Sequence, residues 1–182
     1  MLYKKCTLAM ISIFFITGNI SAQDLGIGPQ VGYYKAKDAD GSFMFGAAIR
    51  MHLTPSLGVE GSINYKQESY DYVTVKSWPV LVTGFFYPIP IAYGSIGAGW
   101  YNTTLDYKKQ ELGNIVVGIK DKTTQEFGWH FGAGAELPVG SNTTLAGDIR
   151  YVFLDYDFEE IPGSDSINSN FYIITASLLF GL

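Results

Sequence analysis

The chain has 182 residues and a formal net charge of −5 at pH 7, from 12 Lys and Arg against 17 Asp and Glu. A mildly acidic chain without a basic cluster argues against nucleic acid as a partner. Its only cysteine is Cys6, which excludes an internal disulfide, and no stretch after residue 22 approaches the ~20 apolar residues of a membrane helix.

The first 22 residues are predicted to be a secretory signal peptide. Lys4 and Lys5 precede an apolar run over residues 8–17, and Ser21-Ala22 places small residues before Gln23. This run is too short to span a bilayer. The alternatives are an uncleaved anchor and a buried first helix. We expect export, with residues 1–22 as signal peptide and residues 23–182 as one domain, whose charge moves from −5 to −7 when the two lysines are removed.

Eight segments of the exported part are about as long as the ~9–11 residues that a tilted membrane strand needs. In chain order they are residues 25–34, 42–53, 57–67, 75–87, 91–101, 124–137, 143–156 and 171–182. Most of them alternate between an apolar and a more polar face, as β-strands do. The alternation is weaker in the first, fourth and fifth segments. There, Pro29 and Pro79 would each remove one hydrogen-bond donor from a strand pair.

The polar faces of these segments are rich in small residues. Segment 124–137 places Gly128, Gly132 and Gly134 on one face, and segment 42–53 places Gly46 and Ala48 there. A soluble β-sandwich would instead turn Lys, Glu, Thr and Ser toward water. Small residues with a few charges fit a narrow, filled interior, so the bulky apolar residues are expected to face lipid.

The connections between the segments alternate between short and long. Short connections lie at residues 54–56, 88–90 and 138–142, and long or polar ones at 35–41, 68–74, 102–123 and 157–170. Short turns on one side and longer loops on the other are typical of outer-membrane barrels, with both chain ends on the periplasmic side. We therefore predict an all-β fold, an eight-stranded antiparallel up-and-down transmembrane β-barrel. A soluble β-fold is the alternative.

Two further features fit this barrel. Five aromatic side chains fall toward the long-loop ends of their segments and are expected at the outer membrane interface: Trp78, Trp100, Trp129, Tyr34 and Tyr101. The last segment remains apolar to its final residue. We expect it to close the barrel beside the first segment, which leaves no strand edge in lipid.

Two stretches resemble the small outer-membrane β-barrel family of Gram-negative bacteria, which includes the transmembrane domain of outer membrane protein A. They are FGWHFGAGAELPVGSNTTLAGDIRYVF and the terminal FYIITASLLFGL. The second is similar to the family's C-terminal assembly signal, here carried by Tyr172, Phe180 and Leu182. The family usually ends in an aromatic residue, whereas this chain ends in Leu182, with Phe180 two residues earlier. The resemblance implies a location in the bacterial outer membrane, among lipid and lipopolysaccharide. It also implies assembly by the barrel-assembly machinery with periplasmic chaperones.

Inward-facing charges are expected to fill the lumen. Arg50, Glu60, Glu136, Asp148 and Arg150 all lie near a short turn, so they should gather in the periplasmic half. Since isolated buried charges are costly, we expect an ionic network with Arg50 near Glu60 and Arg150 near Glu136 or Asp148. This network is either a static plug or, as the resemblance to outer membrane protein A implies, a gate whose pairs exchange partners. The further polar lumen residues are His52, Lys66 and His130.

Catalytic, metal and cofactor sites are not expected. Neither His52 nor His130 lies in a motif like those of lipid- or peptide-cleaving barrels, so hydrogen bonding in the lumen is the preferred role. The sequence has no HExxH, Cys pair, phosphate-binding glycine loop or EF-hand pattern. We therefore predict no enzyme, no metal and no cofactor.

The expected function is structural or surface-interacting, with at most a narrow gated pore. The long loop at 102–123, in which residues 115–119 are suited to a protruding hairpin, offers an extracellular protein an edge for strand addition. One alternative is a carrier for small hydrophobic compounds that leave sideways into lipid, with an apolar pocket open near the outer end and lined by Phe85, Tyr87 or Tyr101. The other alternative is a soluble secreted lipid-binding β-barrel.

Overall fold

The computed structural model describes residues 25–36, 41–69, 73–107, 110–112, 115–117, 122–156, 167–168 and 170–182. The predicted signal peptide lies outside these residues. Eight long strands make up the fold: β1 (Leu25–Ala36), β2 (Ser42–Thr54), β3 (Leu57–Ser69), β4 (Val73–Ile89), β5 (Ala92–Tyr107), β8 (Lys122–Pro138), β9 (Thr143–Tyr156) and β11 (Phe171–Gly181). Three short strands accompany them: β6 (Gln110–Leu112), β7 (Ile115–Val117) and β10 (Ile167–Asn168). None of the described residues belongs to a helix that could span a membrane.

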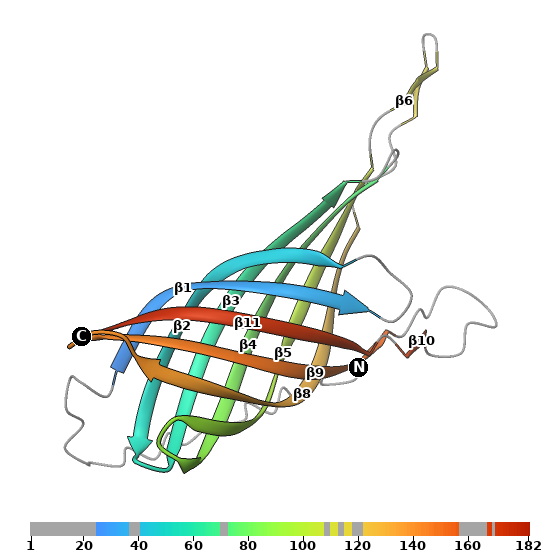
Figure 1. Ribbon diagram of the computed structural model, residues 1–182. Helices are drawn as coiled ribbons and strands as arrows, with labels where there is room; N and C mark the ends of the chain where they lie inside the picture. The colour runs from blue at the N-terminus through green and yellow to red at the C-terminus, as the bar shows by residue number, and fades with distance from the viewer. Residues whose placement is uncertain are drawn as a thin grey trace, which may run out of the picture.

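The eight long strands close into a ring in which each strand is antiparallel to both neighbours (Figure 1). Their order is β1-β2-β3-β4-β5-β8-β9-β11, and β11 returns to pair with β1 from Gly26↔Gly181 to Ala36↔Phe171. The predicted fold class is therefore confirmed. The apolar C-terminal strand closes the barrel against the first strand, as its sequence indicated.

The two faces of the strands differ as expected for a barrel in lipid. On β2, Phe45 is 64% exposed on the outside whereas Arg50 is only 1% exposed on the inside. On β8, Trp129 is exposed and its neighbour His130 is buried. Large apolar side chains thus cover the outer surface, and the polar, glycine-rich faces line the interior. The soluble β-fold is wrong, because it requires the opposite arrangement.

Each of the two prolines interrupts one ladder, as predicted. Pairing between β1 and β11 stops at Ile27↔Phe180 and resumes at Gln30↔Ser177, on either side of Pro29. Pairing between β3 and β4 stops at Ile63↔Val80 and resumes at Lys66↔Ser77, next to Pro79. A proline nitrogen carries no hydrogen, so it cannot donate to the neighbouring strand.

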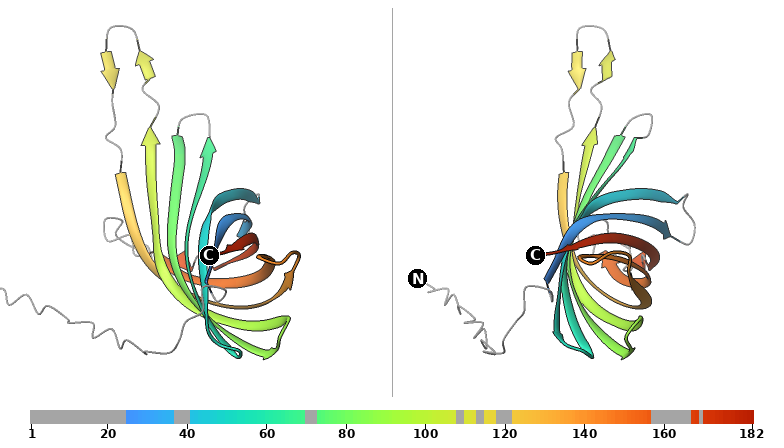
Figure 2. Two further views of the ribbon diagram at one scale, coloured as in Figure 1. Left: turned by 90° about the vertical axis from the view of Figure 1, so that its left-hand side faces the viewer. Right: turned by 60° about the vertical axis from the view of Figure 1, so that its left-hand side comes forward.

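The outer rim of the barrel is uneven. Strands β4 and β5 remain paired up to Val73↔Tyr107, and β5 and β8 up to Leu105↔Lys122, so these strands run further than the sequence predicted. Figure 2 shows β3, β4, β5 and β8 rising above β1, β2, β9 and β11, with β6 and β7 beyond them. The pairing of β6 with β7 fits a protruding hairpin within the predicted loop 102–123.

Candidate functional site: a lumen with two levels

The periplasmic half of the lumen contains a single connected ionic network. Arg50 on β2 donates from Nε and Nη2 to Glu60 Oε2 on β3, at 3.0 and 2.6 Å. Arg150 on β9 donates from Nη2 to Glu60 Oε1 at 3.0 Å. Glu60 therefore accepts from both arginines, one on each carboxylate oxygen. The two arginines are the only ones in the chain, and both are almost completely buried.

Both ends of this network are held by a further carboxylate. Arg50 Nη1 donates to Glu136 Oε2 at 3.0 Å, and His52 Nε2 lies 2.8 Å from Glu136 Oε1. On the other side, Arg150 Nε donates to Asp148 Oδ1 at 2.7 Å. The chain of contacts thus runs His52–Glu136–Arg50–Glu60–Arg150–Asp148 across four strands. It joins β2 to β8, which are not neighbours in the wall.

Hydroxyl groups and a ring complete the network. Tyr87 donates its hydroxyl to Glu136 at 2.9 Å, and Tyr93 and Thr175 donate theirs to Asp148 at 3.1 and 2.9 Å. Thr83 accepts from Arg150 Nη1 at 3.2 Å, and its hydroxyl lies 3.0 Å from His130 Nε2. The Arg50 guanidinium also lies over the Phe85 ring, 4.2 Å from its centre. These hydrogen bonds offset part of the free-energy cost of removing the charged groups from water.

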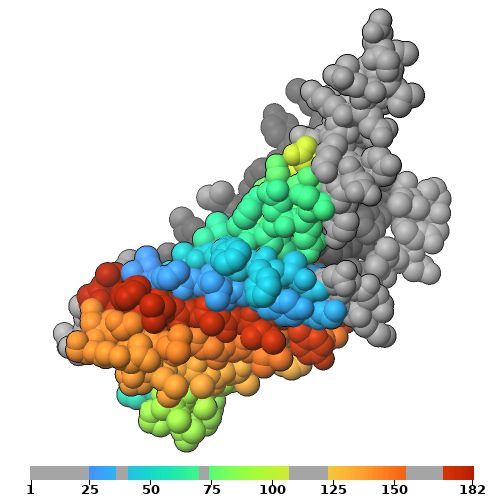
Figure 3. Space-filling view, turned by 45° about the horizontal axis from the view of Figure 1, so that its top comes forward, coloured from blue at the N-terminus to red at the C-terminus, as the bar shows by residue number. Residues whose placement is uncertain are grey.

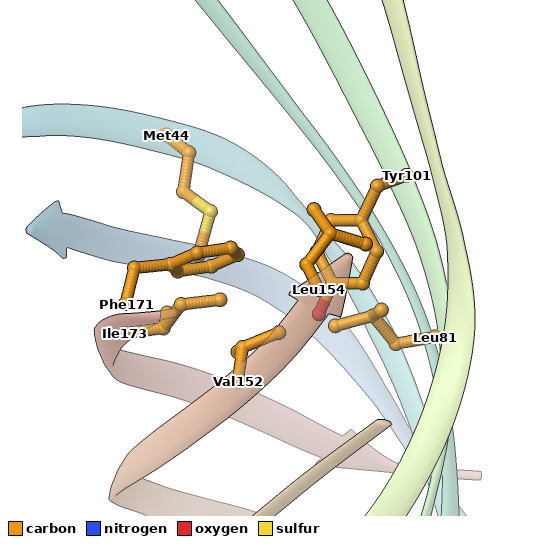
Figure 4. Packing of buried hydrophobic residues seen from close by; sticks show 7 residues of the cluster. All are labelled: Met44, Leu81, Tyr101, Val152, Leu154, Phe171 and Ile173. Carbon is orange, nitrogen blue, oxygen red and sulfur yellow. The ribbon is translucent and has the colours of Figure 1, made fainter. Parts of the chain in front are cut away.

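Above the network the lumen becomes apolar. Seven buried side chains pack together there: Met44, Leu81, Tyr101, Val152, Leu154, Phe171 and Ile173 (Figure 4). A cavity of about 200 Å³ lies against this cluster. Its walls are mostly hydrocarbon and aromatic ring, with Lys66, Ser77 and Thr103 as the hydrophilic side chains. The interior therefore has two levels, a polar one near the periplasm that the ionic network spans and an apolar one with a cavity near the outer rim.

The structure places the predicted lumen residues inside the barrel and contains both expected pairings, with Asp148 as the partner of Arg150 out of the two that the sequence left open. Arg50 contacts Glu60, and Arg150 contacts Asp148. Glu136 pairs with Arg50 and His52 and has no contact with Arg150 among the described ion pairs. His130 is buried beside Thr83. Lys66 lies nearer the outer rim than the ionic network, in the lining of the cavity, with Nζ 3.5 Å from Glu68 Oε1.

Two of the five predicted interface aromatics require correction. Tyr101 is only 4% exposed and belongs to the apolar cluster inside the barrel. Tyr34 packs against the same cluster and against the Phe171 ring at 4.4 Å. Successive strand residues point to opposite faces, so Tyr101 cannot share a face with the exposed Trp100. Trp100 and Trp129 lie on the outside, and Trp78 is half-buried.

The pocket expected for a hydrophobic carrier is also placed differently. Tyr101 does line the outer cavity. Phe85 and Tyr87 lie instead near the periplasmic end of β4, where they pack with Tyr93 around the ionic network. The residues of the predicted assembly signal, Tyr172, Phe180 and Leu182, are exposed on the outer surface.

Sequence reasoning missed several lumen groups. Thr83, Tyr87, Tyr93 and Thr175 contact the charged residues, and Gln30 links Asn64 to Ser177 through hydrogen bonds of 2.8 and 2.9 Å. A usable signal was the spacing of two residues that puts Thr83, Phe85 and Tyr87 on one face of β4. In the described part of the chain no group of three acidic, His or Cys side chains is arranged to hold a metal ion.

Comparison with known proteins agrees with this architecture. A sequence model of the outer membrane protein beta-barrel domain matches residues 6–180. The crystal structure of Neisserial surface protein A (NspA) is similar at a TM-score of 0.57 and 12% identity, covering 91% of this chain and 100% of that one. A major outer membrane protein from Thermus thermophilus is similar at a TM-score of 0.58 and 11% identity, covering 86% and 98%. No protein with a curated description matches the sequence.

Proposed function

This chain belongs to the outer membrane protein β-barrel domain family, and we propose that it is a closed barrel with a structural or surface-interaction role that does not conduct ions. It is a protein of the bacterial outer membrane. The observation that carries the proposal is the position of Glu60 between Arg50 and Arg150. An eight-stranded barrel has an interior only wide enough for side chains, and here these side chains are tied to one another across the lumen.

A closed lumen is tested by planar-bilayer conductance. We expect no steady current from the wild-type protein and a measurable current from Arg150→Ala. That substitution removes the contacts to Glu60, Asp148 and Thr83 together. Trp129→Ala, on the outer surface, is the control for loss of a large side chain. Wild-type channels that open and close would instead establish the gate that the resemblance to outer membrane protein A implies.

The surface role is expected to depend on the part of the chain beyond the rim. β6 and β7 pair there, and the tall strands β5 and β8 lead to them beyond the shorter strands β1, β2, β9 and β11 (Figure 2). The test is deletion of residues 112–122 with measurement of bacterial attachment to host cells or matrix proteins. Unchanged attachment would remove adhesion through this hairpin, and the barrel would retain the structural role alone.

A second candidate is a carrier for small hydrophobic compounds, which the outer cavity favours. The cavity is lined by Met44, whereas Met51 on the same strand is an outward position of β2. With ¹³C-methyl methionine and the barrel in nanodiscs, added naphthalene should shift the Met44 methyl signal more than that of Met51. Ser77→Phe, which fills the cavity, should weaken this binding about tenfold, whereas Val80→Phe on the outer face should not. Equal shifts of the two signals would contradict the carrier.

A further inference from the structure

Two neighbouring strands of the barrel wall, β2 and β3, are not paired along their whole length beside the outer cavity. Strands β2 and β3 are paired up to Phe45↔Tyr65. Beyond that pair β2 still extends to Ser42 and β3 to Ser69, yet the two are not paired with each other. Strand β3 remains paired with β4 up to Ser69↔Thr74, so it follows the tall side of the barrel while β2 turns away (Figure 2). A split therefore separates β2 from β3 in the outer half.

The cavity lies directly behind this split. Met44 and Lys66 are the inward residues that follow the last pair on β2 and β3, and both line the cavity. On the outside, the split is bordered by Phe43, Phe45 and Tyr65, which are all exposed. Exposed aromatic residues at the upper end of an apolar belt are typical of the region where acyl chains meet the head groups. The split thus places a stretch of wall without β2–β3 pairing between the apolar cavity and the lipid.

Passage in the other direction is closed. Below the cavity, Leu81 and Val152 are buried in the apolar cluster, and the network of Arg50, Glu60 and Arg150 lies beneath them. These charges satisfy one another, so an apolar molecule would have to displace them to continue toward the periplasm. On the face that Figure 3 shows, β9, β11, β1 and β2 are packed side by side. A compound in the cavity therefore has two routes, the outer mouth and the split.

One side chain bridges the split. Lys66 projects from β3 and places Nζ 3.7 Å from the centre of the Tyr34 ring on β1, so it reaches past the unpaired end of β2. Glu68 holds the same ammonium group from the other side, at 3.5 Å. A cation over an aromatic ring contributes ~0.5–2 kcal/mol. The wall strands are held by their own backbone pairing, so this side chain can leave the ring without disturbing them.

We propose that the outer cavity exchanges small, uncharged apolar compounds with the outer leaflet sideways, through the split between β2 and β3. Lys66 closes this opening by lying on Tyr34. This inference rests on the proposed carrier function and specifies the place in the barrel wall where the compounds pass. The substrate class follows from the lining, which is mostly hydrocarbon and aromatic ring, and from the cavity volume of about 200 Å³.

The route is tested with a probe that cannot use the outer mouth. A phospholipid with a naphthyl group at the end of one acyl chain is anchored in the bilayer, so its naphthyl group can reach the cavity only from the side. In nanodiscs, this lipid should shift the Met44 methyl signal as free naphthalene does. If free naphthalene binds and the anchored probe leaves Met44 unchanged, the sideways route is wrong while the carrier stands. If neither probe shifts Met44, the carrier itself fails.

The closure is tested by removing the bridge. Lys66→Ala should raise the exchange rate of the anchored probe at Met44 at least threefold. Lys76→Ala removes a lysine that is paired with Asp106 and is not part of the cavity lining, since it lies on the opposite face of β4 from Val75 and Ser77; this variant should leave the rate unchanged. Tyr34→Leu removes the same contact from β1 and serves if the first variant does not fold, as judged by heat-dependent gel mobility. Equal exchange rates in the wild type and these two bridge variants would overturn the closing role of Lys66.

Discussion

Replacing Arg50 by methionine tests the ionic network most sharply. The wild-type network has two arginines against Glu60, Glu136 and Asp148, so its formal charge is −1 when His52 is neutral. Arg50→Met keeps an unbranched aliphatic stem but removes the guanidinium group, which changes this charge to −2. Glu60 loses two hydrogen bonds, of 3.0 and 2.6 Å, and Glu136 loses one of 3.0 Å. Removing one partner of a buried pair costs ~3–5 kcal/mol.

A matched control comes from an exposed pair. Lys76 donates to Asp106 at 2.9 Å, with side chains 36% and 41% exposed. Exposed ion pairs contribute ~0.2–1 kcal/mol, so Lys76→Met should change the free energy of unfolding by no more than that. Both variants exchange a cation for methionine in the wall of the same barrel. The expected difference between them is therefore about 2–5 kcal/mol.

The assay is urea unfolding of the barrel refolded in lipid vesicles, with the folded fraction measured by gel mobility before and after boiling. Adding Glu60→Leu to Arg50→Met removes the carboxylate that lost two hydrogen bonds and returns the formal charge of the network to −1. This should recover part of the lost stability, a coupling that contacting residues show. If Arg50→Met costs less than about 1 kcal/mol, as a surface pair would, the buried charges do not stabilise one another and the network is refuted.

Two other predictions concern closure and membrane contact. A Cβ on Gly28 would clash with the Leu178 carbonyl oxygen on the neighbouring strand, whereas a Cβ on Gly94 would have no heavy atom within 4 Å. Gly28→Ala should therefore lower the folded yield severalfold in the refolding assay and Gly94→Ala should not; equal yields would show that β1 and β11 are not so close. Trp100 and Trp129 are exposed on the outer surface, so lipids with brominated acyl chains should quench most of their fluorescence, whereas unquenched emission would contradict a lipid-facing position.

The faces of β2, β3, β8, β9 and β11 were predictable because bulky apolar residues alternate with small or charged ones. Strand β4 was not, since Pro79, Val80, Leu81 and Val82 are apolar on both faces. The interior faces of β4 and β5 carry Thr83, Tyr87 and Tyr93, so these partners of the charged residues were missed for the same reason. Tyr101 lies near the outer end of its strand, as an interface aromatic residue would. It directly follows the outward-facing Trp100, however, so its side chain points into the barrel.

Contacts across the lumen are harder to predict than contacts along the wall. Arg50 and Glu60 are register partners on neighbouring strands, and the short turn between them makes their pairing evident. Glu136 is 86 residues from Arg50, on a strand that does not touch β2 in the sheet. Its choice of Arg50 over Arg150 depends on how the strands tilt around the barrel. Alternation and turn lengths do not determine that tilt.

The split between β2 and β3 has a similar origin. Alternation continues through Met44 and Lys66 as if the strands stayed together, and both residues do face inward. The separation arises because β3 follows the longer strands β4 and β5, whereas β2 follows β1. Unequal strand lengths around a closed ring therefore produced the feature on which the proposed sideways exchange depends.

The closed lumen is tested most directly by the arginine side chains themselves. Arg50 and Arg150 are the only arginines, and their Nε atoms donate to Glu60 and Asp148 at 3.0 and 2.7 Å. With selective ¹⁵N-arginine labelling of the barrel in nanodiscs, we expect two Nε–H signals that exchange slowly with water at neutral pH. Signals broadened away by rapid exchange would show water-filled space around both guanidinium groups, and that result would contradict the closed lumen.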